Sequence, residues 1–285
     1  MRKAALISAA LLAAVAAIPA VLQAAPAAPA PAAAAAADPE MAKALADPRR
    51  DKDRARDAFR HPAETLAFFR IKPGMTVADY MPSSGWYTRI LVPYLGDRGT
   101  YIGITGSLNS AFGETRDRLA AFPSTFPGKA AGWTGVPASR IPAYTLDAIP
   151  AERKGTVDRV MIMREVHNMW PDGFLYNDLA AIRALLKDDG LLGIEEHRAK
   201  ADAPSNYTQG TMGYMREADV IALIEAHGFK LIGKSEVNAN PKDPANWPDG
   251  VWTLPPVLSQ KDKDRAKYEA IGESDRMTLL FAKRP

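Results

Sequence analysis

The hydrophobic and polar positions between residues 71 and 105 follow the order strand, loop, helix, strand. A short apolar run reaches Asp79, and a loop of small residues follows at 82–85. A helical segment at 86–95 then leads into a second apolar run at 100–105. Strand–helix–strand units of this kind build parallel sheets. In doubly wound folds the loop after the first strand lies beside a nucleotide-like ligand, so this loop is a candidate binding site.

The same alternation continues along the rest of the chain. The further elements that the pattern predicts are helices at 108–121, 178–186 and 216–227, a turn at 187–190, and strands at 157–163, 191–195, 229–237 and 277–283. Residues 122–145 are rich in Pro, Gly and Ser and give no assignable pattern. Strands that alternate with helices predict an α/β fold, a three-layer sandwich around a mostly parallel, doubly wound sheet.

Residues 38–285 are predicted to form one domain with two additions. The first is a group of N-terminal helices at 38–70, where Asp-Pro and His-Pro pairs are typical helix starts. The second is an insert at 238–275 between the last two strands, which is too long for a plain connection. Its proline-rich turns predict a rigid cover near the site, anchored by Trp247 and Trp252. A surface loop far from any ligand is the alternative.

The N-terminus has the pattern of a secretory signal. Two basic residues precede an uncharged apolar stretch at 4–22, and the small residues around Ala24 suit cleavage. We therefore expect a signal peptide at 1–24, an Ala/Pro-rich linker at 25–37, and a periplasmic or secreted protein without a stable membrane span. A permanent N-terminal membrane anchor is the alternative, because the stretch is about long enough to cross a bilayer. Its richness in alanine rather than leucine favours cleavage.

Charge and cysteine content exclude several classes of function. The formal net charge of +3 includes Arg2 and Lys3, and without these two residues it is 3 − 2 = +1. No Lys/Arg run is interleaved with aromatic residues, so we expect no nucleic-acid partner. The absence of cysteine excludes disulfides, thiolate metal sites and a cysteine nucleophile. The sequence also lacks a GxSxG elbow and a P-loop lysine, which disfavours hydrolases and kinases.

Polar residues follow the predicted strands at the edge where ligands bind. After the first strand come Asp79, Ser83, Ser84 and Gly85. Backbone N–H groups of such a loop, at a helix N-terminus, suit a carboxylate or another anion. The alternative is a plain strand-to-helix turn with a serine cap.

Two more groups of polar residues follow the later strands. His167 could act as a general base, since the histidine pKa lies near neutrality, and Asn168 could orient a substrate. The alternative is a pair that satisfies local backbone groups. Glu195, Glu196 and His197 could form a metal half-site or an acid–base pair. No further ligand lies at a metal-binding spacing, so a salt-bridged structural histidine is favoured and no metal is expected.

Several strings recur in a known group of proteins. They are RDKDRARDAFRHPAETLAFFRIKPGMTV, SSGWYTRILVPYLG, REVHNMW, GLLGIEEHR, NANPKDP, DGVWTLPP and IGESDRM. With them, and over nearly all of residues 51–284, the chain resembles class I S-adenosylmethionine-dependent methyltransferases. It resembles more closely a group of exported predicted methyltransferases of bacteria. The resemblance implies a Rossmann-like, class I methyltransferase-like sheet with an antiparallel last strand.

The resemblance also implies a function. We expect methyl transfer from S-adenosylmethionine to a small-molecule ligand or another, unknown methyl acceptor. The implied cofactor-binding residues are Asp79, Ser83, Ser84, Gly85 and Thr105, and the implied catalytic residues, which face the acceptor, are His167 and Asn168.

The chain departs from the family at three positions. The family's first motif is usually acidic-x-Gly-x-Gly-x-Gly, and here Met81 and Ser83 replace the first two glycines. Thr105 stands where the family usually has an acidic residue that accepts the ribose hydroxyls. An exported, non-catalytic binding protein that kept the fold and lost the cofactor is therefore the alternative function.

Overall fold

The computed structural model describes residues 38–285. The predicted signal peptide (1–24) and linker (25–37) lie outside the described residues. Within 38–285, no helix has the length and apolar character needed to cross a membrane.

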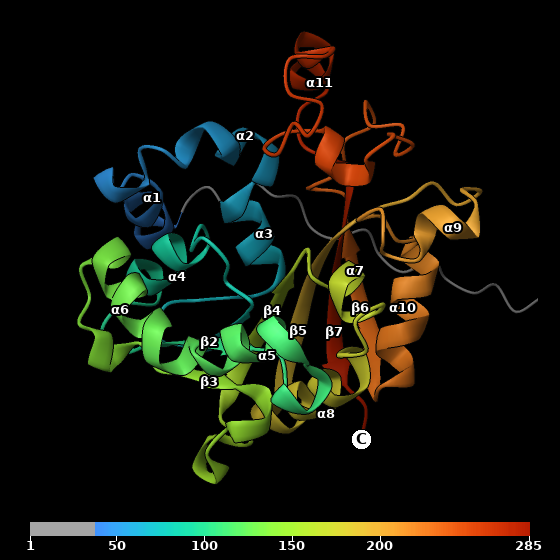
Figure 1. Cartoon of the computed structure of the whole chain (residues 1–285). Helices are drawn as coiled ribbons and strands as arrows, with labels where there is room; N and C mark the ends of the chain where they lie inside the picture. Colours follow the sequence, from blue (N-terminus) through green and yellow to red (C-terminus); the bar gives the residue numbers. More distant parts are fainter. Residues whose placement is uncertain (1–37) are drawn as a thin grey trace, which may run out of the picture. The chain divides into compact units, whose positions relative to one another are not determined.

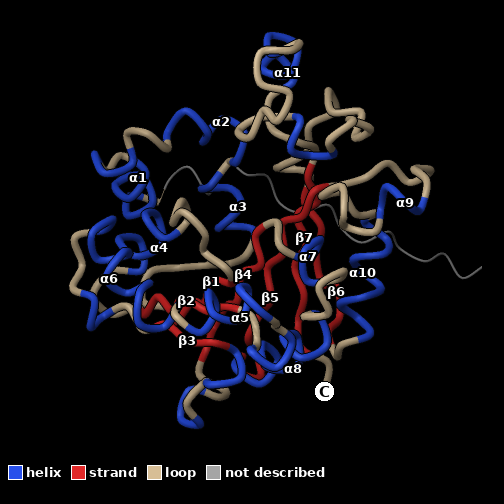
Figure 2. The backbone as a smooth tube through the Cα atoms, in the orientation of Figure 1, coloured by secondary structure: helices blue, strands red, loops and turns tan. Residues whose placement is uncertain are grey.

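A seven-stranded sheet forms the centre of the domain (Figure 2). Its strands, in the order in which they lie side by side, are β3 (Ala143–Thr145), β2 (Thr100–Thr105), β1 (Thr76–Tyr80), β4 (Val157–Met163), β5 (Leu186–His197), β7 (Arg276–Lys283) and β6 (Phe229–Ser235). The pairs among β1 to β5 are parallel, whereas β7 runs antiparallel to both of its neighbours. This arrangement confirms the predicted fold class, including the antiparallel last strand.

Helices cover both faces of the sheet and make the three layers (Figure 1). One face carries α1 (Pro39–Leu45), α3 (Pro62–Phe68), α4 (Thr88–Leu95) and α6 (Phe122–Thr134). The other face carries α5 (Gly113–Ala120), α7 (Val166–Met169), α8 (Leu175–Leu185) and α10 (Glu217–Ala226). Both faces of the central strands are therefore buried, which is why β4 ends in four consecutive apolar residues, 160–163.

The start signals in the N-terminal region mark real helices. The Asp38 carboxylate accepts hydrogen bonds from the backbone N–H groups of Glu40 and Met41, which caps α1. His61 takes a left-handed conformation before Pro62 begins α3. The remaining short helices are α2 (Asp57–Arg60), α9 (Ser205–Thr208) and α11 (Arg265–Ile271).

Two segments differ from the prediction. Residues 122–145, which gave no pattern, form α6 and the edge strand β3. α6 tolerates Pro127 inside it and ends at Gly135 in the left-handed conformation. The predicted turn at 187–190 is wrong, because these residues belong to β5. They form an irregularity there: Val157 pairs with Leu186, but the next recorded pair joins Arg159 to Leu191.

The insert at 238–275 builds a small core of its own. Trp247 is buried in a separate hydrophobic cluster, where its indole N–H donates to the Asp243 carboxylate over 2.8 Å. The Tyr214 hydroxyl donates to the same carboxylate over 2.9 Å. In Figure 1 the insert, in orange to red, lies beside the blue α2 at one end of the sheet. The Arg56 and Arg60 side chains make ion pairs with Glu273 there.

Candidate active site

Two cavities adjoin at the carboxyl ends of β1 and β4. We call the first, of about 460 Å³, the β2 cavity; its lining includes Tyr80, Met81, Ser83, Thr105, Gly106, Thr115, Leu119, Phe122, Phe126, Lys129, Glu165, Asn168, Met169, Asp172 and Phe174. We call the second, of about 370 Å³, the arginine cavity; its lining includes Arg56, Arg60, Asp79, Met81, Ser83, Ser84, Trp86, Arg164, Glu165, His167, Asn168, His197, Trp252, Leu254, Pro255, Glu273 and Ser274. Four residues line both cavities, namely Met81, Ser83, Glu165 and Asn168.

Three residues of the loop after β1 adopt a conformation that favours glycine, although only one of them is glycine. Met81, Ser83 and Gly85 have φ angles of 51°, 50° and 75°, all in the left-handed region. This conformation costs a residue other than glycine about 1–2 kcal/mol. The Thr105 hydroxyl donates to the Met81 sulfur over 2.8 Å, and the Met81 N–H donates to the Ile104 carbonyl over 2.8 Å. Strain of this kind persists where the surrounding structure enforces it, often at functional sites.

Gly85 has a packing role that the sequence did not indicate. A Cβ atom at this position would lie 2.3 Å from the Trp133 ring of α6. Gly85 lines neither cavity, and its close packing holds the loop against α6. Its role in cofactor binding stays a prediction.

The other predicted cofactor residues divide between the cavities. Thr105 lines the β2 cavity, Ser83 lines both, and Asp79 and Ser84 line the arginine cavity. Within residues 38–285, the backbone N–H groups of Ser83 and Ser84 have no protein partner. The loop therefore presents free donors at the point where the two cavities meet.

Asp79 lies buried at the end of β1. Its carboxylate accepts a hydrogen bond from the Tyr101 hydroxyl over 2.8 Å. Burial raises the pKa of Asp79 to about 7, although the Tyr101 hydrogen bond opposes this. Asp79 can therefore hold a proton near neutral pH.

His167 forms a pair with Glu196. Its Nδ1 lies 2.9 Å from Oε1 of Glu196, and its backbone N–H donates to Oε2 of the same carboxylate over 3.0 Å. Burial lowers the pKa of His167, but the charge and hydrogen bond of Glu196 outweigh burial and raise it. The second ring nitrogen, Nε2, has no partner within residues 38–285, and His167 lines the arginine cavity. This geometry suits a base with a fixed orientation.

His197 lies next to this pair. Its ring centroid is 5.4 Å from that of His167, and its Nδ1 lies 2.5 Å from Oγ of Ser274. Burial, followed by the charge of His167, holds the pKa of His197 well below its usual value. His197 is thus tied to a serine hydroxyl rather than to the salt bridge that the sequence suggested.

The donor atoms of His167, Glu196 and His197 lie within 4.8 Å of one another, close enough for a metal ion. The Glu196 carboxylate, however, already faces three nitrogens: the His167 N–H, the His167 Nδ1 and the His197 N–H. These bonds make Glu196 better suited to hold the two histidines than to bind a cation.

Sequence analysis did not predict several of the residues that line the arginine cavity. Arg56 and Arg60 come from the region before β1, and Trp252 comes from the insert. The four-residue spacing of Arg56 and Arg60 places both on one face of a helical segment, a signal that was available. Trp252 does not anchor the insert as predicted. Its side chain packs edge-on against His167 and is 37% exposed, so it forms a wall of the cavity.

The β2 cavity fits the adenosyl part of S-adenosylmethionine. Its apolar wall is aromatic and suits a planar base, with Phe122, Phe126 and Phe174. Thr105 and Lys129 supply polar groups on the same cavity, and Asp172 supplies a carboxylate. Its volume lies in the range of pockets that hold such ligands.

The strand order, with its antiparallel last strand, is that of the class I methyltransferase-like, Rossmann-like fold that the sequence predicted. No protein-family model and no curated protein matches the chain. Among solved structures, a SAM-dependent methyltransferase from Aquifex aeolicus is 21% identical, with 70% of this chain and 93% of that chain covered and a TM-score of 0.45.

Two further similar structures are also methyltransferases. The 1,6-didemethyltoxoflavin-N1-methyltransferase of Burkholderia thailandensis, with bound S-adenosylhomocysteine, is 15% identical, with 89% of each chain covered and a TM-score of 0.45. The geranyl diphosphate C-methyltransferase of Streptomyces coelicolor is 12% identical, with 88% of this chain and 87% of that chain covered and a TM-score of 0.49. The likeness at this level concerns the fold.

Proposed function

We propose that the protein transfers a methyl group from S-adenosylmethionine to an acceptor bound in the arginine cavity. The observation that carries this proposal is the meeting of the two cavities at Met81, Ser83, Glu165 and Asn168. A cofactor in one cavity and an acceptor in the other would face each other across these residues. Methyl transfer depends mainly on such alignment of donor and acceptor.

The chain supplies binding and orientation for this reaction. When bound, S-adenosylmethionine supplies an electrophilic methyl group. Thr105, Lys129 and the aromatic wall of the β2 cavity would hold the cofactor. Asn168, whose amide donates to Oε2 of Glu165 over 2.8 Å, would orient the acceptor.

His167 would remove the proton that an acceptor hydroxyl or amine loses. Its Nε2 takes the proton, while Glu196 fixes the ring and stabilises the charge that forms. Removing a general base typically lowers the rate about 10²–10⁴-fold. We therefore expect His167→Gln to lower label transfer from methyl-tritiated S-adenosylmethionine to a panel of small hydroxy and amino compounds by that factor. S-adenosylhomocysteine binding should stay unchanged. Equal label transfer by both proteins would contradict the role of His167.

We further propose that the protein belongs to the exported bacterial group that it resembles. Its N-terminal pattern supports a periplasmic or secreted location after cleavage near Ala24. Cell fractionation with intact-mass analysis tests this. A full-length chain in the cytosol would contradict export, and a full-length chain in the membrane would favour the N-terminal anchor.

A non-catalytic binding protein is the second candidate. The observation in its favour is that the Thr105 hydroxyl is engaged with the Met81 sulfur, at the position where the family has a carboxylate. A neutral group in this place makes weaker hydrogen bonds to a ribose than a carboxylate does. Absence of S-adenosylhomocysteine binding at millimolar concentration would favour this candidate.

A further inference from the structure

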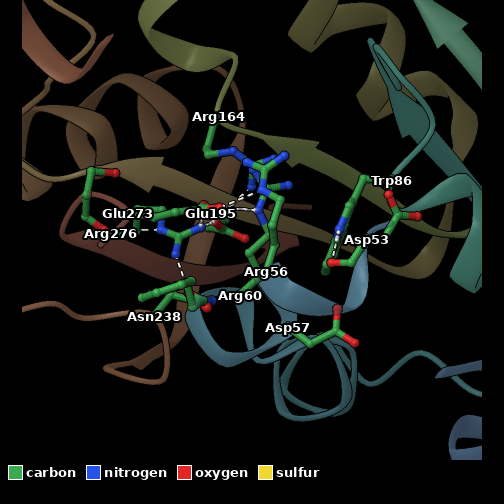
Figure 3. A network of polar contacts seen from close by, with 12 residues as sticks. Asp53, Arg56, Asp57, Arg60, Trp86, Arg164, Glu195, Asn238, Glu273 and Arg276 are labelled. Atoms are coloured by element: carbon green, nitrogen blue, oxygen red, sulfur yellow. Dashed lines mark hydrogen bonds and ion pairs between the residues drawn. The ribbon is translucent and has the colours of Figure 1, made fainter. Parts of the chain in front are cut away.

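We propose that the arginine cavity recognises an anionic group of the acceptor, a carboxylate or a phosphate, through Arg60 and Arg164. This inference rests on the proposed function, because it assigns a chemical class to the acceptor. Figure 3 shows the two guanidinium groups gathered with those of Arg56 and Arg276 beside two glutamates.

The ion pairs of this cluster leave positive charge in excess. Arg56 and Arg60 share the Glu273 carboxylate, at 2.7 and 3.0 Å. Arg164 and Arg276 share the Glu195 carboxylate, at 2.9 and 2.7 Å. Four guanidinium groups therefore face two carboxylates, an excess of 4 − 2 = 2 positive charges.

Arg60 carries unused donors into the cavity. Only its Nε bonds to protein, and within residues 38–285 its two terminal nitrogens have no partner. The side chain is 6% exposed and lies over the Trp86 ring, 4.9 Å from the ring centroid. The two terminal nitrogens are not among the buried unpartnered atoms of the described residues, so they stay accessible from the cavity, and an anion there could accept their charge-assisted hydrogen bonds.

Arg164 points to the same conclusion from a different element. It follows β4 with a φ angle of 60°, a conformation that few residues other than glycine adopt. One terminal nitrogen bonds to Glu195, and the other has no partner within residues 38–285. Arg276, in contrast, is fully engaged, with bonds to Glu195, to the Ser274 carbonyl and to the Phe59 carbonyl.

Two further carboxyl groups of the cavity, Asp79 and Glu165, offset only part of this excess. Asp79 is bonded to Tyr101, and Glu165 is bonded to Asn168. Burial raises the pKa of Asp79 to about 7, so its negative charge is partial near neutral pH. Burial also raises the pKa of Glu165. Burial, and after it the charge of Arg164, lowers the pKa of Arg60 to about 9.

The other residues that line the arginine cavity indicate the shape and polarity of the rest of the acceptor molecule. Trp86, Trp252, Leu254 and Pro255 present apolar surface to the same cavity. His167 lies on this lining as the base. The site therefore suits a compact molecule with an apolar body, an anionic group at Arg60 and Arg164, and a hydroxyl or amine near His167.

Binding of simple anions to the full-length protein tests this inference. The probes are 4-hydroxybenzoate and inorganic phosphate, with phenol as the uncharged control, each measured by calorimetry. We expect at least one anion to bind and phenol to bind much more weakly. Arg60→Gln should weaken anion binding about tenfold to hundredfold, since hydrogen bonds to charged groups contribute that much. Arg140→Gln removes the same charge at an exposed position outside both cavities and should change nothing.

A second variant separates recognition from mere structural damage. Glu273→Gln frees Arg56 and Arg60 and increases the positive charge of the cavity, so it should tighten anion binding. Damage to the fold would weaken binding in both variants. Weakening by Glu273→Gln, or no anion binding to wild type at millimolar concentration, would overturn the inference.

The α-carboxylate of the cofactor is the other possible source of the anion. S-adenosylhomocysteine has this group and methylthioadenosine lacks it, so both are titrated in parallel. We expect Arg60→Gln to leave the affinity of both nucleosides unchanged. Loss of S-adenosylhomocysteine binding alone would assign the arginines to the cofactor and overturn the inference. If the wild type binds the anions but neither nucleoside, the result supports the anion site and contradicts the proposed methyl transfer.

Discussion

At the residue scale, the loop after β1 contains two residues other than glycine in the left-handed backbone conformation. Met81 and Ser83 adopt positive φ angles, a conformation that glycine accepts more readily than any other residue. Met81 is held by Thr105 and by the Ile104 carbonyl, whereas the exposed Ser83 side chain makes no such contact. The conformation is therefore imposed by the neighbouring strand and by the tight packing at Gly85.

Ser83 offers a direct measure of this strain. Ser83→Gly should leave stability unchanged or raise it by up to about 1 kcal/mol, because glycine accepts the left-handed conformation without steric cost. Ser83→Val should lower stability by about 1–2 kcal/mol, since a branched side chain resists positive φ. Chemical denaturation of the three proteins checks both values. Equal stability of all three would show that the loop is not strained at Ser83.

Asp79 should make stability depend on pH. Burial raises its pKa from 3.8 to about 7, so the folded protein holds a proton that the unfolded chain releases. This contribution is fully present below pH 4 and is lost as the pH rises through 7. Ionisation of Asp79 therefore lowers the free energy of unfolding by about 4 kcal/mol at high pH. Asp79→Asn keeps the neutral form, so we expect it to raise the melting temperature by several degrees at pH 8.5 and to change it little at pH 4.5.

Asp158 serves as the control for Asp79, because its pKa is shifted in the opposite direction. Burial raises the pKa of Asp158, but the hydrogen bonds from Lys187 and from the Thr76 N–H outweigh it and lower the pKa. Its contribution is therefore present above pH 4 and is lost in acid. Asp158→Asn should destabilise the protein at pH 8.5. If both variants shift the melting temperature in the same direction at that pH, the assignment for Asp79 is wrong.

At the scale of elements, the strands and most helices were predictable because their hydrophobic periodicity is strong. β2 and β4 begin and end where the sequence placed them. α6 was not predicted because Pro127 and two glycines lower the helix propensity of a segment that is stabilised by packing against α4 and β3. Sequence also located the loop after β1 and the His167 segment, but not the α6 contact that fixes Gly85.

The contact between the loop and α6 can be tested by a mutant cycle. Gly85→Ala should destabilise the protein by about 1–3 kcal/mol, because its Cβ would overlap the Trp133 ring. Trp133→Leu removes that obstacle, so the double variant should recover part of the loss. Additive effects in the cycle would show that Gly85 is needed only for its backbone conformation.

At the scale of the whole molecule, the site is assembled from distant parts of the chain. Arg56 and Glu273 are separated by 217 residues in sequence yet form one ion pair. His167, Glu196 and Ser274 come from three different segments around the ends of β4, β5 and β7. No local sequence pattern predicts such pairs, because each pair depends on the order of the strands and on where the insert packs. The sequence could therefore place His167 after a strand that borders the cavity, but it could not predict the partner of His167 or the arginine cluster.

Ligand binding in the β2 cavity is the central claim, and calorimetric titration with S-adenosylhomocysteine tests it most directly. Thr115 lies on α5 and lines this cavity, so Thr115→Trp should fill it and weaken binding by more than tenfold. Asp117→Trp adds the same side chain at an exposed position of the same helix, outside the cavity, and serves as the control. We predict saturable binding to wild type and to the control, with loss in Thr115→Trp. No binding to wild type at millimolar ligand, or equal binding to all three proteins, would contradict the account.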